Sequence, residues 1–125
     1  MIRCALVAAA CAAALPAFAQ ATRTFPANAL RGEMVVTLPP QIELNGKPAR
    51  LAPGARIVDE RNLLQLSGAL VGKRLVVHYT RDNAGQPQQV WILTPAERAR
   101  QPWPVNDQEQ RGWLFDAAGQ RWIKP

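Results

Sequence analysis

The sequence is poor in the side chains that most enzymes use for catalysis. Beyond residue 19 it holds no cysteine, one histidine (His78) and one serine (Ser67). The ligands of a zinc site would have to be His78 and carboxylates alone, since no His-x-His, Cys-x-x-Cys or His-Glu-x-x-His spacing is present. A Ser-His-Asp triad would need Ser67 and His78 with Asp59 or Asp82, but Ser67 lies in Leu-Ser-Gly rather than in a Gly-x-Ser-x-Gly elbow. These shortages predict a protein that is not an enzyme and that holds no metal or cofactor.

Two short motifs approach catalytic signatures without matching them. The stretch 68–73 (GALVGK) is one residue shorter than a phosphate-binding loop, and Arg74 stands where Ser or Thr would hold magnesium. A strand is expected after it, whereas the phosphate site needs a helix N-terminus. Asp59 and Glu60 are adjacent carboxylates, but neighbours on an extended chain point apart, and a glycosidase needs two acids facing each other. We interpret the first motif as a turn and the second as a solvated loop.

The long apolar run is confined to the N-terminus. Hydrophobic residues fill 17 of the first 19 positions, Arg3 supplies a positive charge, and residues 17–19 (AFA) form the small-x-small pattern that signal peptidase reads. Pro16 breaks the run before it reaches the roughly 20 residues of a membrane-spanning helix. The sequence therefore predicts a signal peptide over residues 1–19, cleaved after Ala19, a periplasmic location and no transmembrane anchor. An alternative is lipidation at Cys11, because residues 8–11 loosely resemble a lipobox that lacks its usual leucine.

Cleavage would change both the cysteine content and the charge. It would remove Cys4 and Cys11, so the mature chain would have no disulfide and would depend on its core for stability. Loss of Arg3 would lower the net charge from +6 to +5. The remaining basic residues are mostly arginines and form no run of five or more. This distribution predicts a generally cationic surface and not a tail that binds nucleic acid.

From residue 32 onward, short runs of β-forming residues alternate with Pro and Gly turns. The clearest strand, 75–80, is followed by a turn at 82–85 (DNAG) and by a partner strand. Alternation places Val90 and Ile92 on one face of that partner and Trp91 and Leu93 on the other. Both faces of that partner are expected to be partly covered. Asn45-Gly46 predicts another tight turn. Candidate strand segments lie at residues 34–38, 41–45, 49–51, 56–59, 63–66, 75–80 and 88–94, and five or six short strands are expected among them.

The last third of the chain begins with a helix signal. Thr94 and Glu97 form a capping box, and Pro95 occupies the first helical position, so a short helix is expected as far as Gln101, with Pro102 ending it. Strands at 113–115 and 121–123 flank 116–120 (DAAGQ), which repeats the form of 82–86 (DNAGQ). We interpret the repeat as one hairpin turn used twice.

Together these elements predict a mainly β fold, a small antiparallel barrel or strongly bent sheet of OB-like or SH3-like type, with one short capped helix and a C-terminal hairpin. The expected organisation is a signal peptide (1–19), an N-terminal lead-in (20–31), a barrel domain (32–101), a polar linker (102–110) and a C-terminal β-hairpin (111–125).

Arginines and tryptophans gather in the C-terminal quarter of the chain. Arginine grips carboxylate and phosphate in a bidentate way and stacks on flat groups. In an exported protein this mixture predicts a non-enzymatic binding protein for an anionic envelope component such as lipopolysaccharide, peptidoglycan or phospholipid head groups, through Arg111, Trp113, Arg121 and Trp122. Two alternatives stay open: the tryptophans only cover the open end of the barrel, or the protein is an accessory subunit of an envelope complex that pairs through an exposed sheet edge.

Three stretches, 25–32 (FPANALRG), 51–57 (LAPGARI) and 76–97 (VVHYTRDNAGQPQQVWILTPAE), resemble a family of small exported proteobacterial proteins with no assigned activity. The resemblance covers about residues 25–97. It implies export and a small β-barrel, and it brings no catalytic residues.

Overall fold

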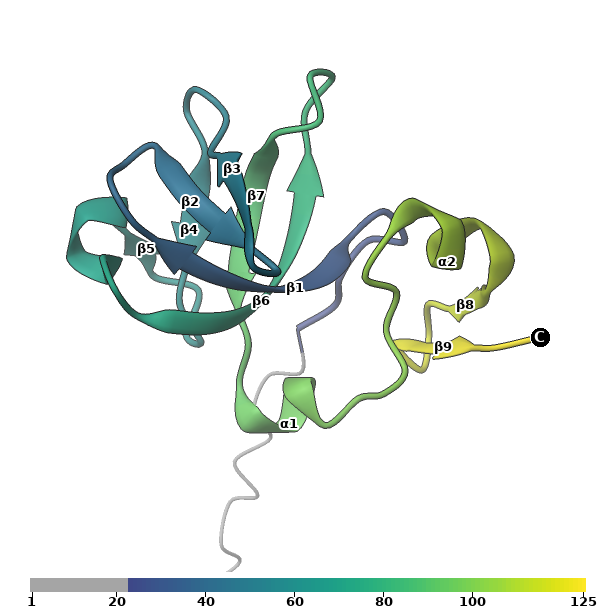
Figure 1. Cartoon of the computed structure of the whole chain (residues 1–125). Coiled ribbons are helices and arrows are strands. Elements are labelled where there is room, and N and C mark those ends of the chain that lie inside the picture. The colour runs from purple at the N-terminus through teal and green to yellow at the C-terminus, as the bar shows by residue number, and fades with distance from the viewer. Residues whose placement is uncertain (1–22) are drawn as a thin grey trace, which may run out of the picture.

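The structure, a computed structural model, describes residues 23–125 of the chain (Figure 1). The expected signal peptide, its cleavage site and the alternative lipidation site at Cys11 lie outside these residues. In chain order the elements are β1 (Leu30–Val36), β2 (Gln41–Leu44), β3 (Lys47–Arg50), β4 (Arg56–Val58), β5 (Leu64–Gln65), a 3-10 turn η1 (Ser67–Leu70), β6 (Arg74–Arg81), β7 (Pro87–Ile92), α1 (Pro95–Arg98), α2 (Asp107–Gly112), β8 (Leu114–Asp116) and β9 (Arg121–Ile123). In the described part of the chain, no helix has the length and apolar character needed to cross a membrane.

The fold is mainly β, as expected. One sheet has the strand order β3-β2-β1-β6-β7-β4-β5, and β8 pairs separately with β9. All the neighbours in the large sheet are antiparallel except β4 and β7, which run parallel with Ile57 opposite Val90. The sheet is therefore mostly antiparallel, as the sequence predicts, with one parallel pair that the sequence did not indicate. Ile57 and Val90 enter the same core from these neighbouring strands.

The large sheet is bent around its main hydrophobic core. Leu30, Met34 and Val36 alternate along β1 with more exposed residues and face Val77 and Tyr79 of β6. Ile42 of β2 and Ile57 of β4 belong to the same core, although three strands separate β2 from β4 in the sheet. Such a contact requires curvature. Within the described residues, however, the edge strands β3 and β5 are not hydrogen-bonded to each other, so the sheet is bent without closing into a barrel.

Both Asp-x-Ala-Gly-Gln stretches form hairpin turns, between β6 and β7 and between β8 and β9, as predicted, but their backbones differ, so they are not the same type of turn. In the first, Gly85 takes a positive φ of 81° and its N–H donates to the Asp82 carbonyl. In the second, the positive φ of 49° falls on Gln120 instead. The physical reason is tertiary, because the side chain of Gln120 is buried against the N-terminal segment of the structure.

The segments expected to be a lead-in and a linker are packed parts of the fold. Phe25 and Ala29 are buried, and β1 already begins at Leu30. Trp103 is also buried, and α2 begins at Asp107 after its N-cap Asn106. The polar linker predicted over 102–110 is therefore wrong in both structure and burial. The predicted capping box is present, although α1 ends at Arg98 rather than near residue 101.

A candidate binding surface at the C-terminal end

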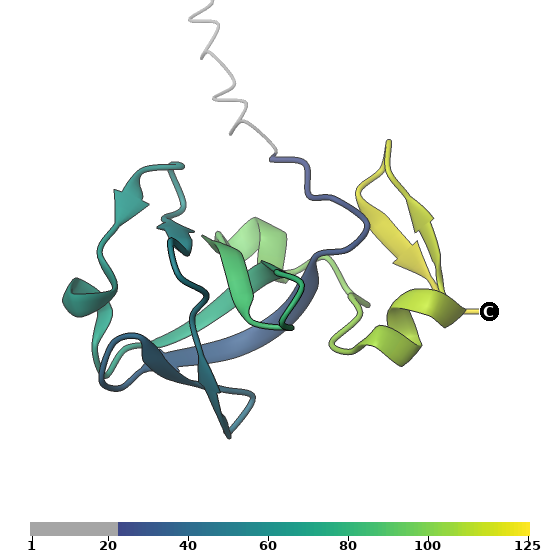
Figure 2. The same cartoon turned by 90° about the horizontal axis from the view of Figure 1, so that it is seen from above.

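A second hydrophobic cluster covers the outward face of β6 and β7. The strands contribute Val76 and Trp91, and Leu93 follows β7. The cover comes from both ends of the described chain, and Figures 1 and 2 show α2, β8 and β9 beside the segment that leads into β1. The covering residues are Phe25, Ala29, Trp103 and Trp122, with Trp113 and Phe115 at the margin. Both faces of β7 are therefore buried in part, as predicted for that strand, and the C-terminal hairpin packs on the sheet.

His78 is part of this second cluster. Its ring is fully buried, stacks on Trp103 with centroids 4.1 Å apart, and meets Phe25 edge-on at 4.4 Å. Burial, reinforced by the charge of Arg31, lowers the pKa of His78 to about 2. Its Nε2 accepts a hydrogen bond from Nε of Arg31 at 3.2 Å, and no hydrogen bond joins it to Ser67 among the described residues. His78 is thus a neutral packing residue, and the described chain contains no cluster of three or more His, Cys, Asp or Glu side chains suited to a metal ion.

The pKa of His78 predicts a loss of stability in mild acid. The chain has one histidine, whose pKa is near 6.5 when unfolded and about 2 when folded, so below pH 6.5 the unfolded state binds the additional proton. We expect the free energy of unfolding to fall by about 2 kcal/mol between pH 7.5 and pH 5, at about 1.4 kcal/mol per pH unit below 6.5. Chemical denaturation at each pH measures this change. His78→Gln should remove this pH dependence, and an equal slope in that variant would contradict the assignment.

Arg31 connects the sheet to α1 and to the second cluster. Its Nη2 donates to the Glu97 carbonyl at 2.8 Å, its Nη1 donates to the Arg98 carbonyl at 3.1 Å, and its guanidinium lies 5.7 Å from the ring centre of Trp103. Burial, together with the nearby charge of Arg100, lowers the pKa of Arg31 to about 10. The side chain stays charged at neutral pH. Its hydrogen bonds satisfy the end of α1, so its role is in the fold.

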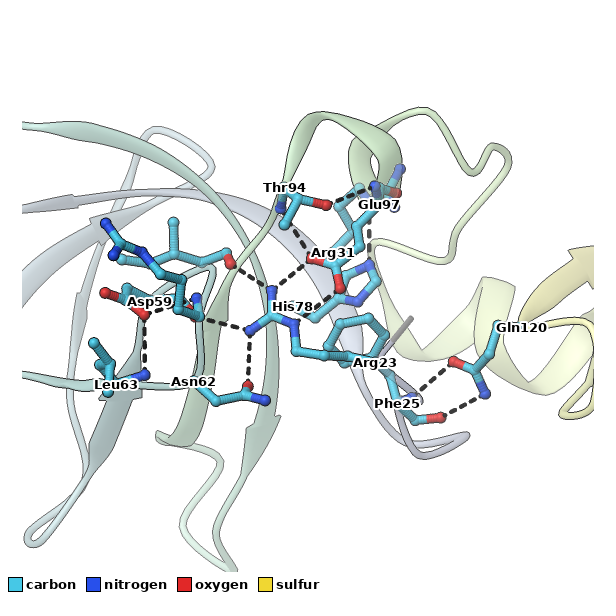
Figure 3. Close-up of polar contacts among 12 residues, drawn as sticks. Arg23, Phe25, Arg31, Asp59, Asn62, Leu63, His78, Thr94, Glu97 and Gln120 are labelled. Atoms are coloured by element: carbon cyan, nitrogen blue, oxygen red, sulfur yellow. Dashed lines mark hydrogen bonds and ion pairs between the residues drawn. The ribbon is translucent and has the colours of Figure 1, made fainter. Parts of the chain in front are cut away.

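Arg23 forms a buried ion pair that the sequence did not predict (Figure 3). Its guanidinium donates to both carboxylate oxygens of Glu97, at 2.9 and 2.5 Å, and also to Asn62 Oδ1 and the carbonyls of Asp59 and Ile92. Burial would raise the pKa of Glu97, but the hydrogen bonds from Arg23 and Thr94 outweigh it and leave the pKa below its usual value. The capping box indicated the position of Glu97, whereas no local pattern indicated its partner.

Gln120 joins the C-terminal hairpin to the N-terminal segment. Its Oε1 accepts from the backbone N–H of Phe25 at 2.7 Å, and its Nε2 donates to the Phe25 carbonyl at 3.3 Å (Figure 3). On α2, Gln110 donates to the Ala27 carbonyl at 2.7 Å. These contacts, together with the second cluster, fix the hairpin against the sheet.

The four residues predicted to bind a ligand occupy different environments. The side chain of Arg121 is 72% exposed, and Arg111 is exposed near the end of α2. Trp113 is half-buried, with the Lys124 ammonium 5.0 Å from its ring centre. Trp122 is only 4% exposed and stacks on Phe115, so its ring belongs to the second cluster. The alternation of side chains along a strand already indicated this difference, because the adjacent Arg121 and Trp122 must point to opposite faces.

An open surface groove runs beside β9. Its lining consists of Gln101, Pro102, Arg121, Trp122, Ile123 and Lys124. No acidic residue lines it, and the nearest carboxylate partner is Asp116, whose Oδ2 lies 3.5 Å from Nε of Arg121 in an exposed pair. The groove therefore offers two cations beside the exposed Ile123. Sequence reasoning missed Gln101, Pro102 and Ile123, because the residues 101–102 and 121–124 meet only in the folded protein.

Comparisons with protein-family models, with curated proteins and with solved structures found no match to this chain.

Proposed function

We propose that the protein is an exported, periplasmic, non-enzymatic binding protein, and that the groove beside β9 binds an anionic component of the cell envelope. The observation that carries the proposal is the placement of Arg121 and Lys124 together on a groove without acidic lining residues. Arg121 supplies a guanidinium that can hold carboxylate or phosphate in a bidentate way. Trp113 and Ile123 provide apolar surface next to these charges, with Lys124 placed over the Trp113 ring.

The charge of the groove supports a polymeric or clustered anion. Each exposed cation contributes little by itself in water, but several can act together on a repeating anion, and salt screens the attraction. Arg111 is exposed near the end of α2 but does not line the groove, so the proposal rests on Arg121 and Lys124. Trp122 forms part of the groove lining, but its side chain is almost entirely buried in the second cluster. We therefore assign it a positioning role rather than a contact with the ligand.

Binding should depend on salt and on the two cations of the groove. Lipopolysaccharide and soluble peptidoglycan fragments are suitable probes, with affinity measured by calorimetry between 20 and 300 mM salt. For the probe that binds, Arg121→Gln/Lys124→Gln should weaken binding by about tenfold or more, because two surface cations contribute roughly 1 kcal/mol each. The salt dependence of the remaining binding should be shallower than in the wild-type protein.

A matched control removes the same two types of charge elsewhere. Lys47 on β3 and Arg56 on β4 are both exposed and do not line the groove. Lys47→Gln/Arg56→Gln should therefore bind the probe nearly as well as the wild-type protein. Equal weakening in both variants would indicate attraction to overall charge and would contradict the site. Absence of binding to either probe at low salt would contradict the proposed function.

The alternative of an accessory subunit that adds a strand to a partner has less support from the sheet edges. The edge strand β3 contains Pro48, which cannot donate a backbone hydrogen bond, and the exposed Lys47. The other edge strand, β5, is only two residues long. Short strands, proline and lysine are features that hinder pairing between sheet edges.

A further inference from the structure

Five large aliphatic side chains are exposed at the end of the sheet formed by β5, η1 and the end of β1. The most exposed of them are Leu66, at 76%, and Leu38, at 71%, although both side chains are entirely apolar. The complete set is Leu38, Leu63, Leu64, Leu66 and Val71, here called the leucine surface. Contiguous apolar surface of this kind is uncommon on a protein that has no partner.

The members of the leucine surface come together through tertiary contacts. Val36 forms a parallel bridge with Val71 and accepts from the N–H of Gly72 at 2.9 Å, which brings the end of β1 next to η1. Ser67 lines the same hollow as Pro39 and Pro40, so the residues after Leu66 lie near those after Leu38. Figures 1 and 2 both show β5 and η1 at the opposite end of the molecule from β8 and β9. The leucine surface is therefore separate from the groove beside β9.

Basic side chains surround the leucine surface. Arg61 and Lys73 are exposed and line one hollow beside it, and Arg50 lines the hollow that contains Ser67. Asp59 and Glu60 line the same hollow as Arg61 and Lys73. The Asp59 carboxylate accepts from the backbone N–H groups of Arg61 and Leu63 and from the Gln65 side chain, and these neutral donors leave its negative charge in place. Three cations against two carboxylates therefore leave one excess positive charge beside the apolar centre.

We propose that the leucine surface docks on a lipid bilayer that carries anionic head groups. The leucines enter the boundary between head groups and acyl chains, while the basic rim contacts the phosphates. Aliphatic side chains suit this environment because they have no hydrogen-bonding group to satisfy. At protein interfaces, by contrast, the residues that contribute most to binding are mainly Trp, Tyr and Arg, whereas leucine is under-represented. The charge of the rim favours an anionic over a zwitterionic bilayer.

Co-sedimentation of the mature protein with vesicles tests the proposal. The vesicles contain phosphatidylethanolamine with phosphatidylglycerol, and parallel samples contain phosphatidylcholine alone. The wild-type protein should bind the anionic vesicles and bind phosphatidylcholine more weakly. Leu38→Gln/Leu66→Gln should reduce binding to the anionic vesicles by about tenfold or more, since each leucine loses apolar burial in the membrane. Both side chains are mostly exposed, so this variant should fold, which circular dichroism checks.

A matched control uses a leucine with the same exposure at the other end of the molecule. Leu114 on β8 is 71% exposed, the same exposed fraction as Leu38, which lies two residues after β1. Leu114→Gln should bind vesicles as the wild-type protein does, and Arg121→Gln/Lys124→Gln should retain most of the binding. The second result would separate this proposal from the proposed function of the groove, because either site can fail while the other binds.

Three outcomes would overturn the proposal. The first is that the wild-type protein does not bind anionic vesicles, and the second is that Leu38→Gln/Leu66→Gln binds them unchanged. The third is that sedimentation without lipid shows self-association that Leu38→Gln/Leu66→Gln abolishes, because a second copy of the chain would then cover the leucine surface. Binding that high salt weakens but does not remove would support docking by both leucines and cations.

Discussion

Replacing Arg23 by methionine is expected to lower the free energy of unfolding by about 3–5 kcal/mol, the range observed when one partner of a buried ion pair is removed. The reason is that Arg23→Met removes the cation that pairs with the Glu97 carboxylate. Both side chains are almost completely buried, so the carboxylate is left as a buried charge without its ion-pair partner. The variant also removes the donors to the carbonyls of Asp59 and Ile92. Urea denaturation monitored by tryptophan fluorescence measures the loss.

Two controls test this explanation. Arg74→Met breaks an exposed pair in which Nε of Arg74 lies 2.9 Å from Oε1 of Glu33, and surface pairs of this kind contribute at most about 1 kcal/mol. Arg23→Met/Glu97→Met should regain part of the stability lost in the single variant, because no buried charge is left without a partner. If Arg23→Met were no more destabilising than Arg74→Met, the buried pair would not hold the N-terminal segment in place.

Trp103→Ala is expected to destabilise the protein by about 3–5 kcal/mol, as is usual when a large aromatic side chain is removed from a core. Trp103 lies between the sheet and the hairpin, with its ring centre 4.1 Å from that of His78, 5.8 Å from that of Phe115 and 6.1 Å from that of Trp122. Its Nε1 also donates to the Ala29 carbonyl at 3.0 Å. Thermal and urea denaturation measure the loss.

Limited proteolysis shows where the Trp103→Ala variant opens. We expect trypsin to cut at Arg111 in the variant before it cuts within the large sheet, because the hairpin loses its main contact with β6. Trp113→Ala is the matched control, since Trp113 is half-buried at the margin of the second cluster. It should cost clearly less stability than Trp103→Ala and leave the digestion pattern unchanged. An equal effect of the two variants would contradict the central position assigned to Trp103.

Local patterns predicted much of the β structure. Five or six short strands are expected among the segments between residues 34 and 94, and the structure has a strand in each segment, β1–β7. The Asn45-Gly46 turn has the two positive φ angles, 54° and 79°, of a tight hairpin. The Thr94–Glu97 capping box is also confirmed. These features depend on period-two alternation and on side chains that bond to their own backbone, so they are readable over a few residues.

The candidate site was predictable only in part. Arg121 is exposed and lines the groove, and Arg111 is exposed, as a surface role requires. The position of Trp122 depends on which face of β9 the second cluster covers, and that is decided by Phe25 and Trp103. A count of aromatic residues in a segment contains no information about that choice. For the same reason, the sequence could not separate the buried Trp122 from the half-buried Trp113.

By itself the sequence determined the class of fold, the shortage of catalytic side chains and the positions of most turns, because these follow from residue type and local spacing. The tertiary structure decided the parallel pairing of β4 with β7, the burial of residues 102–104 and the partners of Glu97 and Gln120. Each of these joins residues that are far apart in the chain. Such pairings are selected by the total packing of two hydrophobic clusters on opposite faces of one sheet, which no local window of sequence contains.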